Sequence, residues 1–386
     1  MSPMMKVPLS SITRVVLGLA ATVSTHPTRK CTDVTVEVPV VSRNAVFNLT
    51  APKSNIDVTN FVLDLTRQGH NLTNEVLAGY TTIEDTYHVV ATYCEPHSGP
   101  SGTLQLLTHG VGFDRSYWDV PTNDYNYSYV AQAVDNGYST FAWDRLGIAQ
   151  SQHGEAVNEI QSYLEIAALH SLTNLLREGS IDGINSGFDK VVHIGHSFGS
   201  IQSYSLAVLY PGASDGLVLT GFSQASQFVS YFGLGGNFVL ANGLPGFKDY
   251  SEGYLAAGDE TAVQTNFFAP GQFDPALLDL AYASGKPVTV GELLTFPGAT
   301  ASENPLTGPV LIITGGRDIP FCGGDCLLTG DPALSNFLEM SRPLFPATSK
   351  FEAVVVDEAG HGLNLEYSHQ LTYSTILGFI TQNVGL

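Results

Sequence analysis

The stretch VVHIGHSFGSIQSYSLA, residues 191–207, places a serine between two glycines where a strand pattern gives way to a helix pattern. The β-branched residues at its start are typical of a buried strand, and the residues from Ile201 onward predict a helix. Gly195 and Gly199 leave room for a sharp, strained turn from which Ser197 would project. The stretch therefore predicts a nucleophilic serine, with an ordinary glycine-rich turn as the alternative interpretation.

Short apolar strands and helical stretches alternate on both sides of this turn. Buried parallel strands have this composition because helices cover both faces of their sheet. Residues 31–100 instead alternate polar and apolar side chains, which predicts antiparallel strands. The predicted fold is a doubly wound, mostly parallel α/β sheet with an antiparallel N-terminal part. Its parallel strands are expected at 104–107, 140–143, 191–194, 217–219, 310–313 and 353–356, and helices at 159–178 and 363–384.

The regular alternation of strands and helices lapses between residues 224 and 308, which are rich in Gly, Phe and Tyr. A structureless loop of that length is unusual within a compact domain. We interpret these residues as an inserted, mainly helical cap over the ends of the strands. The insertion would divide the core into a first part, 25–223, and a second part, 309–386.

The first 24 residues have the layout of a secretory signal peptide. Lys6 and Arg14 precede an apolar run over 15–21, which is too short to span a bilayer, and small residues follow. We predict cleavage between Ala20 and Thr25. No later run has membrane-spanning length, so we expect a secreted chain without a stable membrane anchor. Glycosylation sequons agree with this route and occur at Asn48, Asn71 and Asn126.

Four cysteines in a secreted chain favour two disulfides, for which three pairings are possible. We predict that Cys31 pairs with Cys94 and that Cys322 pairs with Cys326 in the short loop CGGDC. A metal site is the alternative interpretation. Each candidate pair lacks the second pair or the histidine spacing that a zinc site requires, so no metal is predicted.

The charge of the chain argues against a nucleic-acid partner. Acidic residues number 36 and basic residues 16, and no basic cluster or stripe interrupts this excess. Because binding to a phosphate backbone needs clustered Lys and Arg, nucleic acid is excluded as the expected ligand. The sequence contains no pattern that sets an oligomeric state.

A serine nucleophile needs a base to take its proton and an acid to orient that base. GGRD follows the strand predicted at 310–313, and DEAGHG follows the strand at 353–356. Asp318 and His361 thus lie just past the carboxyl ends of two strands, in the chain order serine, acid, histidine. A loop-capping carboxylate is the alternative role for Asp318, with Asp325 and Asp331 as rival acids.

Other acidic and imidazole groups are assigned structural roles. Asp144 begins the segment DRLG after the strand at 140–143, and we expect it to be structural rather than catalytic. His193 is predicted to be buried in its strand, and His196 to support the turn around Ser197. A surface-loop histidine is the alternative interpretation for His361, which its flanking glycines disfavour.

GHSFG, GGRD and AGH together resemble the three catalytic positions of the α/β-hydrolase superfamily, over the region from Leu104 to the C-terminus. The whole chain is also similar to secreted hydrolases of filamentous fungi. The resemblance implies a serine hydrolase with the triad Ser197, Asp318 and His361. Members with an aspartate nucleophile, which include haloalkane dehalogenases and common epoxide hydrolases, are disfavoured by the serine.

Donors for an oxyanion are expected at two places. The backbone N–H of Phe198, the residue after the nucleophile, is one of them. The segment THGVGF, 108–113, resembles the oxyanion loop of the superfamily, which implies the N–H of Val111 as the second donor, or that of Gly112. Gly110 and Gly112 would let this backbone approach the substrate, and His109 would brace the loop.

The predicted reaction is hydrolysis through an acyl-enzyme, without a cofactor. The aromatic cap suggests a small-molecule substrate, an ester or lactone with apolar groups, although these side chains would equally form the cap's own core. An acyltransferase, a lyase or cyclase that uses His361 as base, and a peptidase are alternatives on the same scaffold. A binding protein on a retired scaffold is the remote alternative, which the intact triad disfavours.

Overall fold

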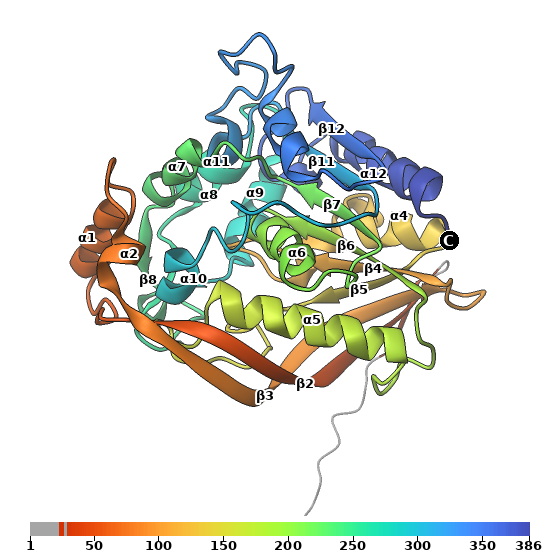
Figure 1. Ribbon diagram of the computed structural model, residues 1–386, viewed down its shortest axis with the longest axis horizontal. Coiled ribbons are helices and arrows are strands. Elements are labelled where there is room, and N and C mark those ends of the chain that lie inside the picture. Colours follow the sequence, from red (N-terminus) through yellow and green to blue (C-terminus); the bar gives the residue numbers. More distant parts are fainter. Residues whose placement is uncertain (1–22, 27–28) are drawn as a thin grey trace, which may run out of the picture.

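The computed structural model describes residues 23–26 and 29–386 (Figure 1). Most of the predicted signal peptide, residues 1–22, lies outside the described residues. Residues 23 and 24 belong to strand β1 (Val23–His26), which pairs antiparallel with β2 (Arg29–Phe47). In the described part of the chain, no helix is long and apolar enough to cross a membrane.

A nine-stranded sheet in the order β1-β2-β3-β5-β4-β6-β7-β11-β12 forms the centre of the molecule. The strands from β5 to β12 pair in parallel, whereas β1, β2, β3 and β5 pair antiparallel. The predicted fold class is therefore confirmed. The remaining strands of this sheet are β3 (Leu77–Pro96), β4 (Thr103–Thr108), β5 (Ser139–Trp143), β6 (Lys190–His196), β7 (Gly216–Thr220), β11 (Val310–Gly315) and β12 (Phe351–Val356).

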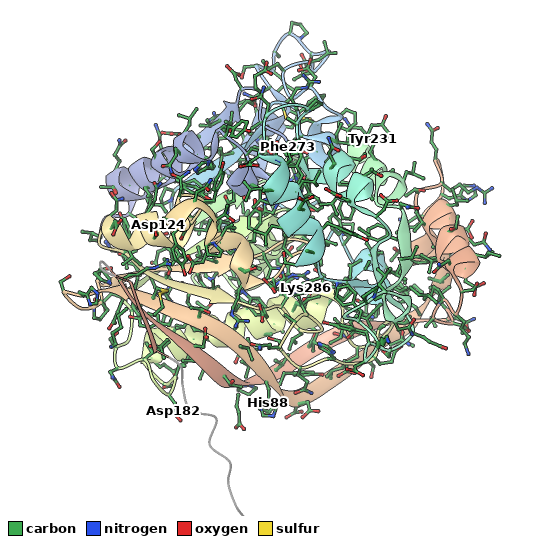
Figure 2. All side chains as sticks on the ribbon, turned by 180° about the vertical axis from the view of Figure 1, so that it is seen from behind. His88, Asp124, Asp182, Tyr231, Phe273 and Lys286 are labelled. Carbon is green, nitrogen blue, oxygen red and sulfur yellow. A yellow bond between two sulfur atoms is a disulfide. The ribbon has the colours of Figure 1, made fainter. Side chains whose placement is uncertain are left out.

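Helices cover both faces of the sheet, as the apolar strands require. In Figure 1, α5 (Ser162–Glu178) and α6 (Phe198–Leu209) lie on the near face, and α4 (Tyr129–Asp135) and α12 (His369–Asn383) lie on the far face, seen from behind in Figure 2. Two large apolar clusters, one toward α5 and one toward α4 and α12, form the core. The closing helix begins at His369 rather than at the predicted residue 363, because Leu363–Leu365 form a 3-10 turn (η5).

The segment between β2 and β3 differs from the prediction. We expected antiparallel strands throughout residues 31–100, but α1 (Asn55–Leu65) and α2 (Leu72–Val76) interrupt them, so the prediction was wrong there. Ser54 caps α1 by accepting the N–H of Asp57, and Val58, Phe61 and Val62 are buried at helical spacing. Short loop elements that precede the nucleophile are η1 (Arg115–Trp118) and α3 (Thr122–Tyr125).

The residues between β7 and β11 lie beside the carboxyl ends of the parallel strands (Figure 1). They form four helices and a small antiparallel sheet, β10-β9-β8, which the sequence did not indicate. Beyond β11 come α11 (Ile319–Cys322) and η4 (Phe337–Leu344). The elements of residues 224–308 are η2 (Ser226–Phe228), α7 (Val229–Gly235), β8 (Phe238–Leu240), η3 (Ala241–Gly243), β9 (Tyr254–Ala257), α8 (Glu260–Phe267), α9 (Pro275–Ala283), β10 (Val288–Thr289) and α10 (Val290–Leu294).

Two disulfides are present, in the predicted pairing. Cys31 and Cys94 are cross-strand partners in the β2–β3 ladder, and Cys322 is bonded to Cys326 in the loop after β11. The two bonds close loops of very different length, with sequence separations of 63 and 4. They therefore restrict the unfolded chain to different degrees.

Replacing both Cys31 and Cys94 with alanine should lower the free energy of unfolding by roughly 4 kcal/mol, because a loop of this length loses much entropy on closure. Removing Cys322–Cys326 in the same way should cost roughly 2 kcal/mol, since that loop is short. Denaturant unfolding of the two double variants and the wild type measures both values. Equal losses would contradict an origin in loop entropy.

Candidate active site

Ser197 lies at the turn between β6 and α6, with φ 56° and ψ −116°. A positive φ is costly for a residue with a side chain, and the surrounding backbone holds it. The N–H of Ser197 donates to Thr220 O over 2.9 Å. A Cβ atom at Gly199 would lie 2.2 Å from Thr108 O, and one at Gly195 would lie 2.3 Å from Gly199 O. Both glycines are therefore required for the close packing that maintains the turn.

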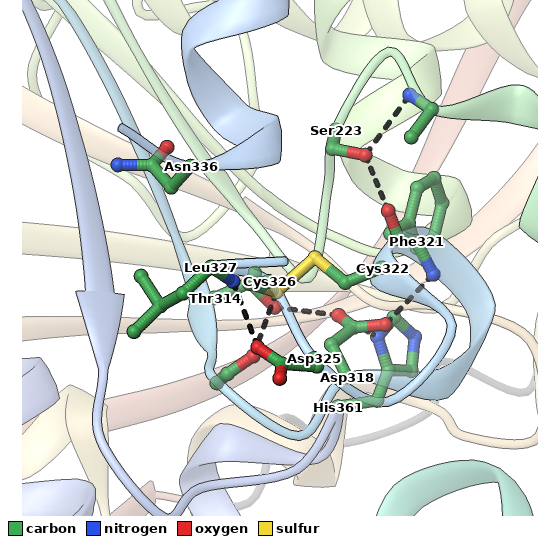
Figure 3. The surroundings of a disulfide bond; sticks show 12 residues. Ser223, Thr314, Asp318, Phe321, Cys322, Asp325, Cys326, Leu327, Asn336 and His361 are labelled. Atoms are coloured by element: carbon green, nitrogen blue, oxygen red, sulfur yellow. Dashed lines mark hydrogen bonds and ion pairs between the residues drawn. A yellow bond between two sulfur atoms is a disulfide. The ribbon is translucent and has the colours of Figure 1, made fainter. Parts of the chain in front are cut away.

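Asp318 and His361, from the loops after β11 and β12, form a hydrogen-bonded pair. His361 Nδ1 lies 2.8 Å from Asp318 Oδ2, and Figure 3 shows the carboxylate among its donors. Thr314 Oγ1 donates to Oδ2 over 2.5 Å, and the N–H of Phe321 donates to Oδ1 over 2.8 Å. Asp318 therefore caps α11 through Oδ1 and is hydrogen-bonded to His361 through Oδ2 at the same time.

The His361 ring lies among aromatic rings beside the serine turn. Its centroid is 4.9 Å from that of His196, the residue before Ser197, and the rings of Phe267 and Phe321 stack on it at 5.6 and 5.5 Å. Nε2 is buried and has no hydrogen-bond partner among the described residues. Because Nδ1 is engaged by Asp318, Nε2 is the ring atom available for proton transfer.

The loop after β4 approaches the serine closely. A Cβ atom at Gly110 would lie 2.9 Å from Ser197 Cβ. His109 Nε2 accepts the N–H of Arg145 over 3.1 Å, so Nδ1 carries the proton that it donates to Gly110 O over 2.9 Å. Burial lowers the pKa of His109 to about 3, which keeps this tautomer neutral. The histidine thus braces the loop through hydrogen bonds at both ring nitrogens.

Among the described residues, the expected oxyanion donors, including the alternative donor Gly112, have backbone N–H groups that are free to bind a ligand. Within the described part of the chain, the amides of Val111, Gly112 and Phe198 donate to no other protein group. Phe198 is the first residue of α6, whose initial N–H groups lack partners within the helix. Two amide sources therefore border Ser197, one from the helix and one from the loop.

The histidines that were assigned structural roles have such environments. His193 Nε2 and Nδ1 lie 2.9 Å from the hydroxyls of Thr173 and Ser214, and burial lowers its pKa to about 3. His196 stacks on Tyr117 with ring centroids 4.4 Å apart, and burial lowers its pKa well below the usual range. Neither ring contacts an acid in the way His361 does.

The alternative acids have other partners. Asp144 forms a buried ion pair with Arg115, and burial raises its pKa to about 6 against the effect of that guanidinium. Asp325 accepts the N–H of Leu327, and Asp331 accepts that of Ala333, so both cap turns of their loop. Of Asp144, Asp318, Asp325 and Asp331, Asp318 is the one that is hydrogen-bonded to His361 in the described part of the chain.

A disulfide borders the acid. Cys322–Cys326 closes the loop directly after Asp318, and Figure 3 shows it beside the Asp318–His361 pair. The N–H of Cys326 donates to Gly316 O and that of Gly324 to Asp318 O, both over 2.9 Å. The bond thus restricts the backbone on both sides of the acid.

Arg145 contacts both segments that carry the expected oxyanion donors, the loop after β4 and the start of α6. The sequence did not predict this role. Its side chain is fully buried and ion-paired with Glu165 and Glu292, and its guanidinium carbon lies 4.8 Å from the centroid of the Phe198 ring. Its backbone N–H is also the group that fixes His109. The two charged partners of Arg145, Glu165 and Glu292, come from distant parts of the chain, so the DRLG segment alone could not indicate them.

Glu366 connects the His361 loop to the 224–308 segment and was also missed. Its carboxylate accepts the N–H of Ala269 over 2.6 Å and that of Gly360 over 2.5 Å. The N–H of Gly362 donates to Phe267 O over 2.6 Å. Three hydrogen bonds thus hold residues on both sides of His361 against the end of α8. No local pattern around Glu366 indicates this role.

The pKa of Glu366 is raised from 4.5 to about 7, chiefly by burial, against the two amides that favour its charge. Between these two values the folded state holds a proton that the unfolded state has lost. The contribution of Glu366 to the free energy of unfolding should therefore be fully present below pH 4.5. It should fall by roughly 3 kcal/mol as the pH rises through 7.

Denaturant unfolding between pH 5 and 8 measures this effect in the wild type and in Glu366→Gln. The variant should lose that part of the pH dependence, whatever its stability at a single pH, while Asp144 contributes equally to both proteins. Parallel pH profiles would contradict the assignment to Glu366.

Comparison with known proteins gives a matching family model and a similar curated protein. A family model described as alpha/beta hydrolase family matches residues 105–372. Epoxide hydrolase 3 of Xenopus tropicalis is 26% identical over 156 residues, which is 40% of this chain and 36% of that protein. The match thus spans little more than a third of the curated relative.

Two solved structures illustrate the likeness in fold. A thermophilic esterase from Thermogutta terrifontis has a TM-score of 0.51 and 16% identity, over 77% of this chain and 94% of that chain. Epoxide hydrolase VrEH1 from Vigna radiata has a TM-score of 0.51 and 15% identity, over 77% and 95%. At these identities the two structures support the fold alone.

Proposed function

This chain belongs to the alpha/beta hydrolase family, and we propose that it is a serine hydrolase that cleaves a carboxylic ester or lactone of an apolar small molecule. The observation that carries the proposal is the Asp318–His361 pair: the buried Nε2 of His361 has no hydrogen-bond partner among the described residues, and its ring adjoins the serine turn. The backbone amides of Val111 and Phe198, which donate to no group in the described part of the chain, support it, because acyl transfer requires donors for an oxyanion.

In the proposed reaction His361 Nε2 takes the proton of Ser197 as Oγ attacks the ester carbonyl. The Val111 and Phe198 amides stabilise the oxyanion, and Asp318 stabilises the imidazolium through Nδ1. The imidazolium then protonates the leaving alcohol, whose bond to the carbonyl carbon breaks. A water molecule, deprotonated by His361, attacks the acyl-enzyme, and release of the acid returns the proton to Ser197.

We propose that residues 224–308 serve as a cap that separates this chemistry from solvent. Ser197, Asp318 and His361 are 3, 0 and 1% exposed, and Phe267 of this segment stacks on the base. Exclusion of water strengthens the hydrogen bonds to a developing oxyanion. It also favours substrates whose groups around the ester are apolar, because the Phe267 and Phe321 rings that stack on His361 present only carbon to them.

Epoxide opening is a second candidate, because epoxide hydrolases occur among the similar proteins. The chemistry of Ser197 argues against it. A carboxylate that opens an epoxide forms an ester, which water can hydrolyse, whereas a serine alkoxide would form an ether. The ether would leave the enzyme alkylated, so a serine nucleophile suits acyl groups.

Treatment with an alkyl fluorophosphonate tests the nucleophile. We expect one adduct per chain by intact mass, located by peptide mapping on Ser197. Ser200→Ala is the matched control, since its hydroxyl lies one turn further along and donates to Thr220 O, and it should label like the wild type. An adduct confined to another residue would overturn the proposal.

Turnover tests the reaction. A panel of apolar esters, lactones and one aryl epoxide should show hydrolysis of acyl compounds and none of the epoxide. Repeating the ester assay with added butanol separates hydrolysis from acyl transfer, because a transferase would form mainly the butyl ester. Epoxide turnover without ester turnover would replace the proposed function by the second candidate.

A further inference from the structure

Two apolar cavities approach the His361 ring, one bordered by Phe267 and the other by Phe321, and both of these rings stack on it. The first has a volume of about 410 Å³ and lies between the oxyanion loop and the 224–308 segment. Val111 and Gly112 form its wall on the loop side, and Phe267 forms its wall toward His361, on which that ring stacks. It therefore borders the position where the oxyanion amides would hold a carbonyl.

The second cavity, of about 270 Å³, borders the same centre from the helix side. Ile201 contributes to its wall one turn after Ser197, whose carbonyl accepts the Ile201 N–H over 3.1 Å. Phe321 forms its wall toward His361 and stacks on that ring at 5.5 Å. Leu65 and Leu72, on both sides of the α1–α2 turn, close it on the outside.

Phe232, on α7, is the one described residue that lines both cavities. Its side chain is 7% exposed, and its ring lies 6.2 Å from that of Phe267 and 5.7 Å from that of Phe238. Its carbonyl accepts the side-chain amide of Asn266 over 3.1 Å, which ties α7 to α8. The ring is thus held in place between the two cavities.

We propose that the two cavities hold the two apolar groups of an acyclic ester, one on each side of the cleaved bond, and that Phe232 separates them and sets their size limits. The inference rests on the proposed function and narrows its substrate class. An ester directs its acyl and alkyl groups away from the carbonyl in opposite directions, which suits two separate cavities that approach the same imidazole, one beside Phe267 and one beside Phe321. A macrocyclic lactone joins these groups in a ring that the Phe232 side chain would obstruct.

The kinetic test uses linear alkyl alkanoates, a branched ester that is bulky on both sides, and a macrocyclic lactone. In Phe232→Ala, the ratio of kcat/KM for the bulky ester or lactone to that for butyl butanoate should rise at least tenfold over the wild type, since a single methylene group in an apolar pocket changes selectivity by about 10–200-fold. Phe232→Trp should lower the same ratio.

Phe228→Ala is the matched control, because this ring belongs to the same segment and lines neither cavity. Its selectivity ratio should equal that of the wild type. If Phe232→Ala and Phe228→Ala give the same ratio, Phe232 is not the size-limiting residue and the inference is overturned.

A binding experiment separates failure of this inference from failure of the proposed function. Calorimetry with the uncleaved esters in a Ser197→Ala background should show the bulky ester gaining at least tenfold in affinity, relative to butyl butanoate, when Phe232→Ala is added. If the affinity for the bulky ester rises but the wild type cleaves no ester, the proposed function fails and the separation of the two cavities by Phe232 stands. If the wild type cleaves esters and the relative affinity for the bulky ester does not rise, the role of Phe232 in separating the cavities is wrong.

Discussion

Ser197→Ala should lower kcat for ester hydrolysis by about 10⁶-fold, because the triad acts as a unit and loses most of its effect when the nucleophile is removed. The backbone strain at residue 197 remains in the variant, since alanine has the same Cβ as serine. The fold and the binding of substrate should therefore be preserved. The residual rate would come from the two oxyanion amides and from binding alone.

The measurement is a single-turnover and steady-state assay on the same ester for the wild type, Ser197→Ala and Ser200→Ala. Unfolding midpoints establish that the three proteins are equally folded. A loss smaller than about a hundredfold in Ser197→Ala would contradict covalent catalysis by this serine. It would instead indicate a reaction in which His361 acts on water or substrate directly.

Asp318→Asn should lower kcat by about 10⁴-fold with little change in the geometry of the loop. The amide can still accept the Phe321 N–H through one oxygen, but the group that replaces Oδ2 would donate to His361 Nδ1. The imidazole would then carry its proton on Nε2. In that tautomer Nε2 cannot accept the Ser197 proton, so the chemical step fails while binding persists.

The kcat and KM of Asp318→Asn, compared with those of the control Asp325→Asn, check this expectation. Asp325 is exposed and caps a turn of the same loop through one backbone bond. The control should retain wild-type kinetics. If Asp318→Asn loses less than tenfold in kcat, another group orients the histidine, and Asp144→Asn should then be measured.

The central sheet and the candidate triad follow from local signals in the chain. Each parallel strand is a short apolar run that ends in a glycine-containing turn, and all of them except the edge strand β12 are buried on both faces. Ser197, Asp318 and His361 all follow such runs directly. Since the carboxyl ends of parallel strands meet at one edge of the sheet, residues separated by more than a hundred positions could be predicted to lie together.

The surroundings of this site depend on contacts that no local pattern encodes. Phe267 contacts His361 only because the end of α8 is hydrogen-bonded to Gly362, and Glu366 bonds a residue almost a hundred positions earlier. Strands as short as β8 and β10, of three and two residues, are below the length at which an alternating pattern can be recognised. Tertiary pairing, and not intrinsic preference, determines such elements.

The helices between β2 and β3 have a consequence for how substrate reaches the buried triad. Asn55 at the start of α1 accepts the N–H of Leu240 over 3.0 Å, and the Thr73 hydroxyl of α2 donates to Leu294 O over 2.7 Å. These helices hold the 224–308 segment from the side opposite the sheet (Figure 1). The segment is therefore not a free flap on two hinges, because a rigid swing away from the core would break this third attachment. Under the proposed function, substrate would enter through smaller displacements of individual rings and loops, and the attachment by α1 and α2 would help to set the rate of entry.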